Sequence, residues 1–113
     1  NPPPNTVEIF KNEEKGSDVN LAVHLLNDVC SGSAKVAILI SNDSDLAEAV
    51  QLAQGHGASV YWYPPVANPR RFPSTDLARV VSHTRSIHKS RYASCQLPNT
   101  VVGLRTINKP TGW

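Results

Sequence analysis

The sequence predicts an α/β protein built on a parallel β-sheet with helices packed on its faces. Residues 35–40 (KVAILI) form an unbroken apolar run, which is typical of a strand buried on both faces of a parallel sheet. A second run rich in aromatic residues, 58–63 (ASVYWY), has the composition of a strand. Helical periodicity lies between the two runs, and strands that alternate with helices build a parallel sheet through right-handed crossovers.

The first half of the chain contributes one more strand and two helices to this prediction. Residues 6–10 (TVEIF) alternate apolar with polar side chains and predict a short strand. In residues 18–30 the apolar side chains recur every three or four positions, which predicts an amphipathic helix capped by Ser17 or Asp18. Residues 43–54 predict a second helix, which ends at the glycine-rich stretch that follows.

The second half gives weaker signals. Residues 75–82 predict a short helix after a Ser74 or Thr75 cap, and residues 84–87 suggest a further strand. Proline and glycine punctuate residues 97–113, which predict an extended C-terminal tail.

Length and composition are those of one folded domain, residues 1–113. Hydrophobic residues make up 40% of the chain and charged residues 18%, a profile that excludes disordered and fibrous proteins. No apolar stretch approaches the roughly 20 residues of a membrane span, and the first residues lack a signal-peptide core. The two cysteines have no metal-ligand pattern around them, so we expect reduced thiols and a cytoplasmic location.

Charge is distributed unevenly along the chain. Residues 1–60 carry three bases and eight acids, whereas residues 61–113 carry eight bases and one acid. This asymmetry suggests a cation site beside a surface that binds a polyanion, although a scatter of solvated surface charges would explain the counts equally well. The bases available to hold a nucleic-acid backbone are Arg70, Arg71, Arg79, Arg85, Lys89 and Arg91.

Three acids follow the predicted strands at the sheet edge where open parallel sheets bind ligands. Asp43 and Asp45 come directly after the strand at 35–40, and Asp18 follows the first strand through a loop. One such acid is explained by helix capping alone. Three like charges in one pocket repel one another unless they are neutralised, and hard divalent cations take oxygen ligands. The cluster therefore predicts a Mg²⁺ or Mn²⁺ site.

A cation at this edge would suit phosphodiester cleavage, because it can activate water and stabilise charge on a phosphate. The aromatic residues Tyr61, Trp62, Tyr63 and Phe72 are candidates for stacking on single-stranded bases. Packing within the sheet explains them more simply.

Four segments resemble the NYN domain, a branch of the PIN-like nuclease fold. EEKGSDVNLAVHLL and VAILISNDSDLAEAVQLA are similar to its second and third motifs. PRRFPSTDLARVVSHTRSI and CQLPNTVVGLRTINKPTGW are similar to the C-terminal part of bacterial NYN proteins. The resemblance implies a Rossmann-like, three-layer α/β/α fold and a ribonuclease that depends on Mg²⁺ or Mn²⁺.

Matched to the family motifs, Asp18, Asp43 and Asp45 are the expected metal ligands and catalytic residues. Lys15 and Asn42 occupy neighbouring motif positions and are expected to contact RNA phosphates. Arg70 and Arg71 are expected to bind the RNA backbone with them.

The chain departs from the family pattern at its beginning. NYN domains start with an Asp-bearing strand that has no counterpart here, and the sequence contains no methionine. We therefore expect the C-terminal portion of the domain, with metal affinity weakened by the loss of one ligand and with an exposed sheet edge that favours a homodimer. Two alternatives remain: a non-catalytic module that binds RNA or protein, and, less favoured, a glycosyltransferase with an Asp-x-Asp motif at residues 43–45.

Overall fold

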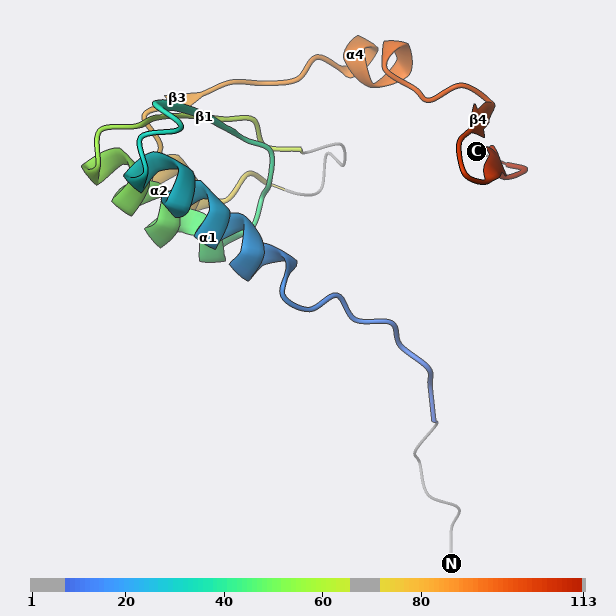
Figure 1. Ribbon diagram of the computed structural model, residues 1–113, viewed down its shortest axis with the longest axis horizontal. Helices are drawn as coiled ribbons and strands as arrows, with labels where there is room; N and C mark the ends of the chain where they lie inside the picture. The colour runs from blue at the N-terminus through green and yellow to red at the C-terminus, as the bar shows by residue number, and fades with distance from the viewer. Residues whose placement is uncertain (1–7, 66–71, 113) are drawn as a thin grey trace, which may run out of the picture.

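The computed structural model describes residues 8–65 and 72–112 of the chain. Its main sheet contains β1 (Val36–Leu39), β2 (Ser59–Trp62) and β3 (His83–Thr84), in that spatial order. Both strand pairs are parallel, with Ile38 beside Tyr61 and Tyr61 beside His83 (Figure 1). The predicted α/β class and parallel sheet are confirmed.

Helices α1 (Ser17–Cys30), α2 (Ala47–Gly55) and α3 (Thr75–Val80) pack on one face of this sheet. The main core lies between them, and its buried members are Leu39, Leu46, Val50, Val60, Trp62 and Leu77. On the opposite face the side chains of Val36 and Ile38 are 59% and 66% exposed. The described residues thus form two layers, and the third layer of the expected α/β/α arrangement stays a prediction.

Helix α1 begins differently from the sequence prediction. Its N-cap is Gly16, which has a φ of 88°, and neither Ser17 nor Asp18 caps the helix. Glycine adopts this left-handed conformation without the steric cost that a Cβ brings. The backbone N–H of Ser17 donates to Glu14 Oε1 at 2.7 Å, so Glu14 satisfies one of the free amides of the first turn.

The predicted helix at 43–54 is divided into two parts. A 3₁₀ turn, η1 (Ser44–Leu46), leads into α2, and the buried Leu46 anchors the turn in the core. The Asp43 side chain caps this turn, as the capping interpretation expects. After α2 the chain reverses at Gly57, whose φ of 92° again requires the left-handed region.

Three further predictions have mixed outcomes. Residues 8–10 form no strand, so the strand predicted at 6–10 is wrong for that part, while residues 6 and 7 lie outside the described chain. The strand expected at 84–87 is the two-residue β3, which starts one position earlier. The cap predicted for α3 is confirmed, because the Leu77 N–H donates to Ser74 Oγ at 3.3 Å.

Residues 88–112, which include most of the predicted tail, contain structure that the sequence did not predict. Helix α4 (Lys89–Ser94) is followed by an antiparallel hairpin of β4 (Thr100–Val102) and β5 (Thr106–Asn108). Figure 1 shows this segment leading away from the sheet, and residues 88–112 are all exposed. Within the two described stretches of chain, no helix has the length and apolarity to cross a membrane.

Leu77→Ala should lower the free energy of unfolding by about 2–5 kcal/mol, because the Leu77 side chain is fully buried and its loss leaves a cavity in the core. Leu104→Ala is the matched control, since the Leu104 side chain is fully exposed in the tail. Urea unfolding of the three proteins checks this. Equal destabilisation by both substitutions would contradict the assigned core.

Candidate metal and nucleic-acid site

The acidic turn, residues 41–45, follows β1 and is held from the core below it. The indole N–H of the buried Trp62 donates to the Ser41 carbonyl oxygen at 2.7 Å. Within the turn the Asp43 N–H donates to Ser41 Oγ at 3.2 Å, and the Asp45 N–H donates to Asp43 Oδ1 at 2.9 Å. These contacts fix the backbone on which both carboxylates stand.

Asn42 connects the acidic turn to the beginning of α3. Its amide nitrogen donates to the Phe72 carbonyl oxygen at 3.1 Å, and its amide oxygen accepts from the Ser74 N–H at 2.7 Å. Asn42 is half-buried. Both polar atoms of its side chain have protein partners, and the expected contact with RNA phosphate stays a prediction.

The structure brings two of the three predicted carboxyl groups together, those of Asp18 and Asp43. Asp18 lies in the first turn of α1 and is half-buried. Partial burial raises the pKa of Asp18, and the negative charge of Asp43 and a hydrogen bond between the two carboxyl groups raise it further. Two acids from segments 25 residues apart in sequence therefore share one small site.

Two more acids surround this pair at longer range. The charges of Glu14 and Asp45 add smaller increases to the pKa of Asp18. The pKa of Glu14 itself is lowered by its hydrogen bonds with Ser17. The sequence singled out Asp45 but not Glu14, which belongs to no strand-end pattern.

This donor set fits a hard cation in part. Asp18 and Asp43 offer carboxylate oxygens, and a cation between them would neutralise their mutual repulsion. Among the described residues, however, no three side chains of His, Cys, Asp or Glu are grouped closely enough to hold one ion. Asp18 and Asp43 thus form a carboxylate pair, and the expected three-carboxylate metal site stays a prediction.

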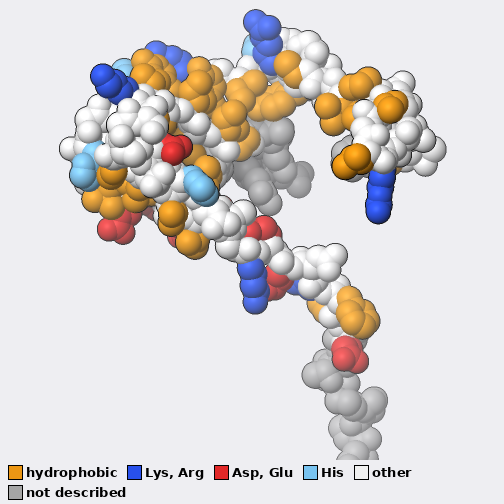
Figure 2. All heavy atoms as spheres, in the orientation of Figure 1, with side chains coloured by type: hydrophobic (Ala, Val, Ile, Leu, Met, Phe, Trp, Pro, Cys, Tyr) orange, Lys and Arg blue, Asp and Glu red, His pale blue; other side chains and the backbone are white. Residues whose placement is uncertain are grey.

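The predicted RNA-binding bases are placed unevenly. Lys15 is exposed and lies two positions before the start of α1. Arg70 and Arg71 lie outside the described residues. Arg85 is exposed, and its guanidinium lies 5.6 Å from the centre of the Tyr61 ring. Figure 2 shows Lys and Arg side chains along the upper side of the molecule, over the sheet and α4.

An aromatic stack lies on the face of the sheet opposite α1, α2 and α3. The rings of Tyr61 and His83 are stacked with centroids 4.4 Å apart and planes 20° apart. The two residues are adjacent in the parallel register, which places their side chains on the same face. The sequence indicated Tyr61 and Arg85 separately but not His83, because the pairing of β2 with β3 is visible only in the fold.

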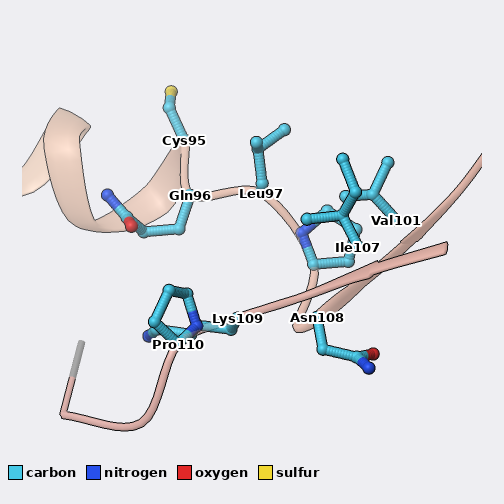
Figure 3. A pocket seen from close by; sticks show the side chains of 9 residues that line it. Cys95, Gln96, Leu97, Val101, Ile107, Asn108, Lys109 and Pro110 are labelled. Atoms are coloured by element: carbon cyan, nitrogen blue, oxygen red, sulfur yellow. The ribbon is translucent and has the colours of Figure 1, made fainter. Parts of the chain in front are cut away.

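A pocket of about 340 Å³ lies in the C-terminal tail, between residues 95–98 and residues 107–110 (Figure 3). Val101 and Ile107 give it apolar walls, and Lys109 is its charged lining residue. It contains none of the acids described above. The sequence did not predict this pocket, since it depends on the unpredicted hairpin.

Asp18→Asn should make the folded chain more stable at pH 7 when divalent cations are absent. The raised pKa means that the folded chain binds the Asp18 proton more tightly than the unfolded chain, so ionisation of Asp18 costs stability as the pH rises through its folded pKa. The gain should shrink as the pH falls and be smallest well below the ordinary pKa of 3.8, where wild-type Asp18 is protonated in both states.

Thermal unfolding of both proteins across this pH range, with the exposed Glu8→Gln as control, measures the difference. A gain that does not depend on pH would contradict the proximity of Asp18 and Asp43.

Comparison with known proteins places the chain among its relatives. It is 33% identical, over 109 residues and 95% of its length, to the 6-hydroxy-3-succinoylpyridine 3-monooxygenase of Pseudomonas putida. The chain spans only 35% of the length of that relative. No solved structure matches it. The sequence profile of the NYN domain matches residues 3–88, which include all three predicted acids, and the chain therefore belongs to the NYN domain family.

Proposed function

We propose that this domain takes part in metal-dependent hydrolysis of RNA. The NYN domain implies a nuclease-like family, and membership of this family supports phosphodiester chemistry. The observation that carries the proposal is the approach of Asp18 to Asp43 at the carboxyl end of β1, with the pKa of Asp18 raised by partial burial and by the charge of Asp43. Such a pair is costly for folding and is useful for binding a cation.

Asp18 and Asp43 would hold Mg²⁺ or Mn²⁺, with Asp45 adding negative charge nearby. When bound, the ion would supply a water molecule of lowered pKa and neutralise charge on the phosphate. Asp43 has a further task within the protein, because its Oδ1 accepts from the Asp45 N–H and so keeps one carboxylate oxygen directed at the turn. Its other oxygen is the better candidate for the ion.

The basic second half of the chain would hold the RNA. Arg79, Arg85, Lys89 and Arg91 are exposed, and phosphate binding by such residues supplies most of the affinity for a polyanion. The Tyr61–His83 stack with Arg85 beside it offers a surface for single-stranded bases. Lys15, Arg70 and Arg71 are proposed to contribute phosphate contacts, and the site works in solution without a membrane. Two copies paired through the edge of β1 that no described strand covers are the proposed assembly.

Asp43→Asn should abolish Mn²⁺-stimulated cleavage of RNA by the full protein that contains this domain, because it removes a ligand charge and leaves the fold intact. Asp28→Asn is the control, since Asp28 is an exposed acid at the far end of α1 from Asp18. The measurement is cleavage of a labelled single-stranded RNA with and without Mn²⁺.

Undiminished cleavage by Asp43→Asn would contradict the nuclease assignment. Salt-sensitive RNA binding by a wild-type protein that shows neither cleavage nor Mn²⁺ binding would favour the non-catalytic module instead.

The second candidate is the activity named for the Pseudomonas putida relative, oxidation of 6-hydroxy-3-succinoylpyridine by a monooxygenase. Identity of 33% across almost the whole chain favours it. The chain corresponds to about a third of that relative, so the rest of such a protein would share in any oxidation. We place it second because nuclease-type chemistry follows from the family as a whole and oxidation from one relative.

If the nuclease proposal is correct, the full protein should consume no extra O₂ when 6-hydroxy-3-succinoylpyridine is added together with reduced nicotinamide and flavin. An oxygen electrode measures this directly, with the same mixture lacking the pyridine as control. Oxygen uptake that depends on the pyridine and is lost in Asp43→Asn would contradict the nuclease proposal and assign the acidic site to the oxidation reaction.

A further inference from the structure

We propose that Asn42 is a positioning residue, whose amide fixes the acidic turn to the start of α3 and so holds the Asp43 carboxylate beside Asp18. The inference rests on the proposed function for its meaning, because Asp43 is there a metal ligand. Its geometry stands independently of the metal.

Two anchors hold the acidic turn. The first is the hydrogen bond from the Trp62 indole to the Ser41 carbonyl, which ties the turn to the buried core. The second is Asn42, which donates to the Phe72 carbonyl and accepts from the Ser74 N–H. Asp43 directly follows Ser41 and Asn42, through which these two anchors act. Asn42 is the residue that connects the turn to the segment before α3.

The Asn42 contacts reach across the chain rather than within the turn. Phe72 and Ser74 are 30 and 32 positions away in sequence, and they precede α3. An amide that donates to a carbonyl and accepts from a nearby N–H fixes both the distance and the orientation of the two segments. The position of Asp43 relative to Asp18 therefore depends on where α3 begins.

Gln54 provides a matched control at the other end of α3. Its amide nitrogen donates to the Val80 carbonyl oxygen, and its amide oxygen accepts from the Ser82 N–H at 2.6 Å. Gln54, on α2, is thus a second side-chain amide with hydrogen bonds to the region of α3, and it is half-buried like Asn42. Gln54 belongs to the last turns of α2, and none of its hydrogen bonds involves an acid.

The experiment compares Asn42→Ala with Gln54→Ala by three measurements: thermal unfolding, hydrogen exchange of the Asp45 amide and Mn²⁺ affinity by calorimetry. The Asp45 N–H donates to Asp43 Oδ1, so its exchange rate reports where the Asp43 carboxylate lies without any metal. Both variants should unfold at lower temperature, because each leaves backbone groups without a partner.

In Asn42→Ala alone, the Asp45 amide should exchange roughly tenfold faster and the Mn²⁺ affinity should fall roughly tenfold, as is typical when a residue that orients a metal ligand is lost. Asn42→Asp keeps the acceptor for Ser74 and loses the donor to Phe72, so its Asp45 amide should exchange at an intermediate rate. It also serves as the test if Asn42→Ala does not fold.

The proposal would be overturned if Asn42→Ala and Gln54→Ala changed the Asp45 amide exchange rate and the Mn²⁺ affinity equally. It would also be overturned if the Asp45 amide exchange rate were unchanged in both Asn42 variants. If the wild-type protein binds no Mn²⁺, the metal dependence in the proposed function is contradicted. The exchange rate of the Asp45 amide still decides the role of Asn42 in that case.

Discussion

The hydrogen bond from the Trp62 indole to the Ser41 carbonyl is the contact on which the arrangement of the site depends. Trp62 fills the centre of the core, and a buried N–H without a partner would cost about 1–3 kcal/mol. The last backbone hydrogen bond between β1 and β2 runs from the Tyr63 N–H to the Leu39 carbonyl oxygen, at 2.8 Å. The indole hydrogen bond from Trp62, at the end of β2, to Ser41 connects the two segments beyond this point. Core packing thus decides where the acidic turn lies.

Much of the helical layer and sheet could be predicted because each element carries its own pattern. Apolar periodicity defined α1, an unbroken apolar run defined β1, and a run rich in aromatic residues defined β2. The start of α1 was missed because a left-handed Gly16, rather than a Ser or Asp cap, begins it. The hairpin was missed because it buries no residue, so its sequence shows no alternation between a core face and a solvent face.

The site was predicted as a set of residues and only partly as a geometry. Position after a strand correctly indicated Asp43, because ligands bind at the carboxyl ends of parallel strands. Asp18 was indicated by a strand at residues 6–10 that does not form over residues 8–10, and its place beside Asp43 comes from the packing of α1 instead. The hydrogen bonds of the Asn42 side chain to Phe72 and Ser74 join segments that are distant in sequence, and so does the stacking of His83 on Tyr61. Such contacts leave no local signal. At the proposed cation site, a proton would compete with the cation for Asp18 because the pKa of Asp18 is raised, so cation affinity would depend on pH.

The β4–β5 hairpin has a consequence for how the chain behaves when it is handled. A two-stranded hairpin without a core is at best marginally stable, and all of its residues are exposed. Local opening there costs little compared with unfolding of the sheet. Limited proteolysis would therefore trim the chain within the tail first and leave β1, β2 and the acidic turn as the resistant fragment.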